Sequence, residues 1–113
     1  MASYSNITIE QGTKFETIID VINSDNSVFN LDGYTAKCTM RKSHYTSSGY
    51  EITVTVYDAA AGQIKMSITP AESYAWKPGR YVYDVIVRNT DDSDIERVIE
   101  GIINLTPAVT QLT

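Results

Sequence analysis

Seven runs of this chain alternate apolar and polar residues, and this period of two constrains the fold more than any other feature. The runs cover residues 5–10, 15–22, 34–42, 51–57, 63–69, 80–89 and 95–105. Residues two apart lie on the same face of a strand, so alternation is typical of strands that are buried on one side. In the sixth run we expect Tyr81, Tyr83, Val85 and Val87 to point inward.

Turn-forming residues separate the runs, as at Asp32-Gly33, Ala61-Gly62, Pro78-Gly79 and the stretch 89–94. Seven short strands at this spacing predict an all-β fold, a two-sheet sandwich of about seven antiparallel strands. One helical turn is expected over 70–76, preceded by a capping threonine. Three apolar residues of the polar loop before Gly33 are expected to pack under the sandwich: Val28, Phe29 and Leu31.

The chain has 113 residues, the length of one ordinary domain, and no linker divides it. We therefore expect a single domain over 1–113, with a short flexible tail at 111–113. The first residues have neither a basic start nor an apolar core, so we expect no signal peptide. No apolar run approaches the ~18 residues that span a bilayer, so we expect no membrane partner.

The formal net charge of −5 argues against nucleic acid as a partner, because phosphate binding needs a basic face. A single cysteine, Cys38, excludes an internal disulfide and a cysteine-based zinc site. Its alternation with Ala36 and Met40 predicts a buried thiol of low reactivity. A single histidine, His44, excludes a multi-histidine metal site and is expected to be exposed at a strand end.

Few residues suggest chemistry. Four acidic residues near the 89–94 turn could be read as a calcium site: Asp91, Asp92, Asp94 and Glu96. They lack the glycine and the spacing of a calcium loop, so we favour a solvated hairpin tip. Asp20 and Asp84 fall on outward positions with no cleft implied around them. We therefore expect no catalytic, cofactor-binding or metal-binding residues, and no enzyme activity.

The stretch YAWKPGRYVYDVIV gathers Tyr74, Trp76, Tyr81 and Tyr83 around the Pro78-Gly79 turn. It could form an aromatic binding platform or a corner of the core. Alternation assigns Tyr81 and Tyr83 to the core and leaves Tyr74 and Trp76 as surface candidates. For Trp76, covering the open end of the core is the favoured interpretation over holding a ligand.

Several large aliphatic residues fall on outward positions of the alternation. They are Ile18, Ile22, Ile86, Val98 and Ile102. A monomer rarely exposes a contiguous apolar patch, so a patch made of these residues would indicate a permanent protein partner.

Five motifs carry a resemblance over nearly the whole chain: IEQG at 9–12, LDGY at 31–34, GQI at 62–64, PGRYVYD at 78–84 and EGIINLTP at 100–107. In these the chain resembles small immunoglobulin-like domains of tailed-bacteriophage virion proteins, especially of marine and cyanobacterial phages. Similar domains open some upper baseplate proteins. The resemblance implies an immunoglobulin-like sandwich in which Pro78, Gly79, Tyr81 and Tyr83 define a corner. Tyr81 would then bond to the chain upstream, and Tyr83 would occupy the usual place of a disulfide cysteine.

The resemblance also implies a non-enzymatic structural role in the virion, assembled in the host cytoplasm. The chain would act as a tail, neck or baseplate accessory or as a capsid decoration. Its partners would be other virion proteins, in multiple copies of a symmetric assembly. The alternative is a carbohydrate- or receptor-binding module, which would use its loop aromatics to bind a host surface glycan.

Overall fold

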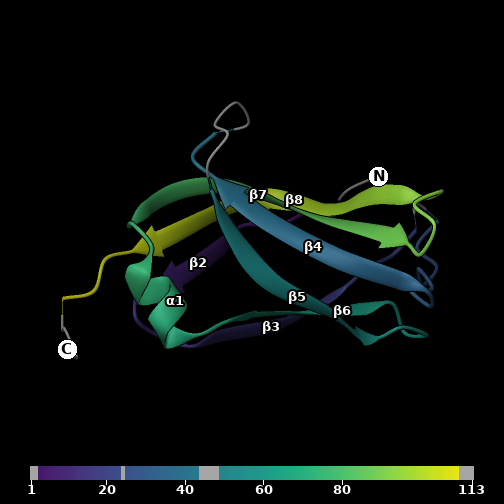
Figure 1. The fold of residues 1–113 in the computed structure, drawn as a ribbon, viewed down its shortest axis with the longest axis horizontal. Coiled ribbons are helices and arrows are strands. Elements are labelled where there is room, and N and C mark those ends of the chain that lie inside the picture. Colours follow the sequence, from purple (N-terminus) through teal and green to yellow (C-terminus); the bar gives the residue numbers. More distant parts are fainter. Residues whose placement is uncertain (1–2, 24, 44–48, 110–113) are drawn as a thin grey trace.

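The computed structural model describes residues 3–23, 25–43 and 49–109. It is almost entirely β (Figure 1). The strands are β1 (Ser3–Tyr4), β2 (Ile7–Glu10), β3 (Phe15–Asp20), β4 (Tyr34–Arg41), β5 (Tyr50–Asp58), β6 (Gln63–Ile68), β7 (Gly79–Asn89) and β8 (Ile95–Thr106). One short helix, α1 (Pro70–Ala75), precedes β7. Each of the seven predicted runs contains a strand, and β1 is the additional one. The expectations for His44 and for the tail at 111–113 lie outside the described residues.

The strands form two layers that share β5 (Figure 1). Sheet A contains β1 and β2, then β8, β7, β4 and the start of β5, where Ile52 lies opposite Cys38. Sheet B contains the rest of β5, then β6 and β3, with Thr53 opposite Ser67. Cys38 is buried and free, so packing rather than a disulfide joins the layers. The chain is therefore an immunoglobulin-like sandwich without a disulfide, as predicted.

Pairing is antiparallel among β3 to β8, whereas β1 and β2 run parallel to β8. Alternation shows that a segment is a strand but says nothing about its direction or neighbour. The chain leaves β2 through the Gln11-Gly12 turn and crosses to sheet B as β3. Because the chain changes sheets after β2, β2 stays in sheet A, where it pairs with the last strand, β8.

The buried side chains of both sheets meet in one core. It includes Tyr81, Tyr83, Val85 and Val87 of β7, the four inward residues that alternation predicts. Val98 contradicts the prediction, because it is 7% exposed rather than outward-facing. The register of β7 against β8 shifts between Val85 and Ile86, so Val98 is the extra residue of a bulge. Both Val98 and the following Ile99 are buried as a result.

The short helix begins where the sequence predicts. The Thr69 hydroxyl accepts a hydrogen bond from the Glu72 amide at 3.1 Å, and the Glu72 carboxylate accepts one from the Thr69 amide at 2.9 Å. This reciprocal capping box satisfies two backbone donors that the helix cannot. Within the described residues, no helix is long and apolar enough to cross a membrane.

The N-terminal segment around Ser5 packs against β8 at Gly101, a residue that has no side chain. Ser5 donates its amide hydrogen to the Glu100 carbonyl at 2.8 Å, and its own carbonyl accepts from the Tyr83 hydroxyl at 2.8 Å. A Cβ added to Gly101 would lie 1.9 Å from the Ser5 carbonyl oxygen. Glycine is therefore required at position 101 for the segment to approach this closely.

Candidate interaction surfaces

The predicted corner lies inside the core. The Tyr81 hydroxyl donates to the Lys77 carbonyl four residues upstream, the kind of bond that the resemblance implies. Gly79 has φ of +147°, a conformation that favours glycine, and it directs the chain into β7 after Pro78. Tyr83 is buried, and this burial raises the pKa of its hydroxyl above the ordinary value. Both tyrosines therefore stabilise the sandwich and offer no face to a ligand.

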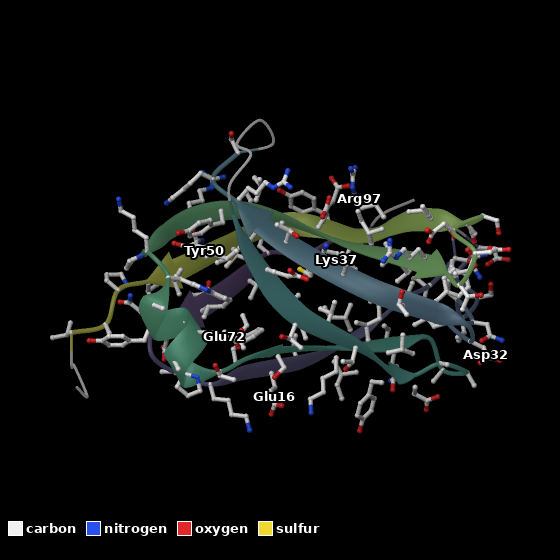
Figure 2. The ribbon with its side chains drawn as sticks, in the orientation of Figure 1. Glu16, Asp32, Lys37, Tyr50, Glu72 and Arg97 are labelled. Atoms are coloured by element: carbon white, nitrogen blue, oxygen red, sulfur yellow. The ribbon has the colours of Figure 1, made fainter. Side chains whose placement is uncertain are left out.

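Trp76 covers an open end of the core. Its ring is stacked on Tyr50, with centroids 5.3 Å apart and planes 21° from parallel, and the residue is 8% exposed. Tyr50 also packs edge-on against Tyr81, and Figure 2 shows Tyr50 beside α1. Tyr74 is half-buried, and its peptide carbonyl accepts from the Gln11 side chain at 3.1 Å. The structure therefore does not bring Tyr74 and Trp76 together as an exposed stacking platform.

The outward isoleucines do not form one patch. Ile86 and Ile102 are half-buried on the outer face of sheet A, whereas Ile18 belongs to β3 in sheet B and Ile22 follows that strand. Figure 2 shows that the two outer faces are opposite, with Arg97 above sheet A and Glu16 below sheet B. Alternation identifies an outward position but not the sheet to which it belongs, which is why the sequence suggested a single patch.

The outer face of sheet A forms an open groove of about 400 Å³. Charged residues divide its apolar parts, because Arg97 contacts Asp84 at 3.2 Å and Glu100 at 3.8 Å. The opposed pair Asp84 and Glu100 separates Ile86, which lies opposite Arg97, from the opposed pair Val82 and Ile102. Such a mixed, solvated face is typical of a protein surface exposed to water.

The outer edge of sheet B is more apolar. Ile18 of β3 is 46% exposed, and Ile22 and Val28, which form an isolated bridge just beyond it, are 45% and 52% exposed. Val28 was expected to pack under the sandwich with Phe29 and Leu31. Leu31 is buried and Phe29 is half-buried, but Val28 points to solvent. The period-two pattern does not extend into this loop, so the sequence could not orient Val28.

The acidic residues of the 89–94 turn and the Cys38 thiol make contacts that stabilise the fold. Hydrogen bonds from the Ser93 hydroxyl and from the Ser93 amide, the latter at 3.1 Å, lower the pKa of the Asp91 carboxyl. Asp94 accepts from the Tyr34 hydroxyl at 2.5 Å. Burial raises the pKa of the Cys38 thiol to about 12. Among the described residues, no group of three or more His, Cys, Asp or Glu side chains is arranged to hold a metal ion.

No family model matches the chain, and no curated protein matches it. Solved structures that align with this chain include Listeria monocytogenes InlP, with 14% identity and a TM-score of 0.49 over 93% of this chain. They also include AggA, the major subunit of aggregative adherence fimbriae type I from Escherichia coli, with 14% identity and a TM-score of 0.40 over 91% of this chain.

A third similar structure is a family 123 glycoside hydrolase from Clostridium perfringens, with 11% identity and a TM-score of 0.43 over 96% of this chain. The chain spans 28% of the length of InlP, 89% of AggA and 24% of the hydrolase. At this level of identity the three carry no information about function, so the surfaces of this chain have to be interpreted from its own residues.

Proposed function

We propose that this chain is a non-enzymatic structural component of a tailed-phage virion. It acts through protein–protein contacts, as a tail, neck or baseplate accessory or as a capsid decoration. The setting is supported by the resemblance of its five motifs to virion immunoglobulin-like domains. The contact role is supported by one observation, the uncovered edge of sheet B with its exposed Ile18, Ile22 and Val28.

An uncovered strand edge offers two kinds of binding energy to a protein partner. Its free backbone groups can extend the sheet, and its exposed apolar side chains lose water on contact. Of the aromatic residues that a glycan-binding module would use, Trp76 is buried and Tyr50 and Tyr74 are half-buried. Tyr4 and Tyr57 are exposed, but they lie on β1 in sheet A and on the part of β5 in sheet B, so they do not form one stacking surface. The observations therefore favour a protein contact over the glycan-binding alternative.

The test is the protein composition of purified phage particles. We expect the chain in particles at a fixed stoichiometry, with density for it at repeated positions in a cryo-EM reconstruction. Absence of the chain from purified particles would refute the virion assignment.

A matched pair of variants then tests the surface. Ile18→Ser should lower incorporation into particles, because it removes exposed apolar area at the β3 edge. Ile95→Ser should leave incorporation unchanged, because Ile95 is 56% exposed but lies in β8 of the other sheet. Equal incorporation of both variants at equal stability would exclude the β3 edge as the contact surface.

A further inference from the structure

The β3 strand ends sheet B without a partner on one side. It pairs with β6 along its full length, and among the described residues nothing pairs with its other edge. Lys14 precedes the strand and Asp20 ends it, so opposite charges stand at its two ends. An open strand edge is a template for another strand, and natural proteins block such edges unless they are used.

The free backbone groups of this edge can be assigned. The Val21 amide donates to the Gly62 carbonyl at 2.7 Å, so the residue that continues β3 points its amide toward β6. In an antiparallel ladder the direction of these groups alternates along the strand. The amides and carbonyls of Glu16, Ile18 and Asp20 therefore face the open edge.

The core is also incompletely covered at this edge. Phe15, Thr17 and Ile19 point inward but are half-buried, while their β6 partners Ile68, Met66 and Ile64 are at most 1% exposed. The difference arises because β6 has a neighbour on both sides and β3 has one. A further strand beside β3 would complete the burial of these three residues.

We propose that a second copy of this chain supplies that strand, with two β3 edges pairing antiparallel about a two-fold axis at Thr17. In this register Lys14 lies opposite Asp20 of the other copy, Phe15 opposite Ile19, and Glu16 opposite Ile18. The backbone groups that face the open edge then lie opposite each other and can bond. Because a two-fold axis repeats every contact, two Lys14–Asp20 ion pairs form.

Charge selects this register over its neighbours. A shift of two residues in one direction places Glu16 opposite Asp20 of the other copy. The same shift in the other direction places Glu16 opposite Glu16 of the other copy. Like charges directly opposed across strands are destabilising. A shift by an odd number of residues would place the free backbone groups of one copy opposite residues of the other copy whose groups face β6, so the hydrogen bonds between the copies could not form. Of these registers, only the one centred on Thr17 combines opposite charges with matched hydrogen bonds.

This inference rests on the proposed function in its choice of the β3 edge as the contact surface, and it names the partner. The two can fail separately. A chain that dimerises in solution but is absent from particles would refute the virion role and keep the dimer. A chain that is incorporated into particles but remains monomeric in solution would refute the dimer and keep the virion role.

Sedimentation velocity of the purified chain, from about 1 µM to 1 mM, tests the dimer over the range of transient association. We expect a concentration-dependent monomer–dimer equilibrium. Lys14→Glu and Asp20→Lys should each weaken self-association about tenfold, because each opposes two pairs of like charges. A monomer across the whole range would overturn the proposal.

The two charge variants also provide a rescue that no effect within one chain can produce. Lys14 and Asp20 are about 20 Å apart along the strand, too far for direct contact within one copy. When the two single variants are mixed, the introduced carboxylate at position 14 of one copy faces the introduced ammonium at position 20 of the other. The native Asp20 of the first copy still faces the native Lys14 of the second, so the mixture should associate as well as the native chain. Failure of the mixture to associate more strongly than either variant alone would overturn the register.

Cross-linking gives an independent measurement. Thr17 lies on the axis, and a non-hydrogen-bonded pair places its Cα atoms about 4.5 Å apart, which suits a disulfide. Thr17→Cys should therefore oxidise to a covalent dimer. Thr55→Cys, on β5 and two strands away from the edge, is the matched control and should remain monomeric. Equal cross-linking of both variants would refute a dimer centred on Thr17.

Discussion

Replacing Gly101 by alanine should destabilise the sandwich by displacing its N-terminal segment. The new Cβ would lie 1.9 Å from the Ser5 carbonyl oxygen, so the backbone at Ser5 has to move. The move breaks the bond from the Ser5 amide to Glu100 and the bond from the Tyr83 hydroxyl to Ser5. Each bond contributes about 1 kcal/mol, and the buried Tyr83 hydroxyl left without a partner costs about 1 kcal/mol more.

Alanine restricts the unfolded chain more than glycine does, which offsets about 0.5–1 kcal/mol. The net expectation is a loss of about 2 kcal/mol in the free energy of unfolding, measured as a lower urea midpoint. Amide hydrogen exchange should also accelerate in β2, because the segment before it no longer binds β8.

Tyr83→Phe is the matched control. It removes the bond to Ser5 without a steric conflict, and it should cost about 1 kcal/mol. In the Gly101→Ala background the same change should instead recover about 1 kcal/mol, since the bond is already broken and the change removes the unpaired hydroxyl. An unchanged urea midpoint for Gly101→Ala, or costs that simply add in the double variant, would refute the reasoning.

Three further predictions concern the core. Tyr81→Phe removes the bond to Lys77 and should lower the free energy of unfolding by about 1 kcal/mol; an unchanged urea midpoint would exclude that role for Tyr81. Trp76→Ala should cost about 3 kcal/mol, because the ring is buried against Tyr50; a stable variant that loses saturable glycan-array binding would instead support the glycan-binding alternative. Native Cys38 should resist thiol reagents at pH 8 and react after unfolding in urea, and rapid labelling of the native chain would contradict its burial. Because the pKa of the folded thiol is raised to about 12, its contribution to stability is complete at neutral pH and is lost as the pH rises toward that value.

The sequence predicted the parts of this fold that depend on local patterns. Alternation located seven strands and the inward residues of β7, and the Thr69–Glu72 pair located the helix. These features are encoded within a few consecutive residues, so no information about distant partners is needed.

Features that depend on a partner strand could not be predicted in the same way. The bulge that buries Val98 arises from the register against β7, which no pattern inside β8 records. The separation of Ile18 from Ile86 depends on which sheet each strand joins. The open edge of β3 is likewise a property of the strand order, so a candidate surface that uses it becomes visible only in the folded chain.

The parallel pairing of β2 with β8 has a mechanical consequence. β2, near the start of the chain, and β8, the last strand, run in the same direction, with four residue pairs in register from Ile7 opposite Ile103 to Glu10 opposite Thr106. Tension applied to the two ends therefore shears this ladder lengthwise and loads its bonds together, whereas an antiparallel terminal pair would open one bond at a time. Under a stretching force, the N-terminal segment should therefore resist extension until all the hydrogen bonds between β2 and β8 break together.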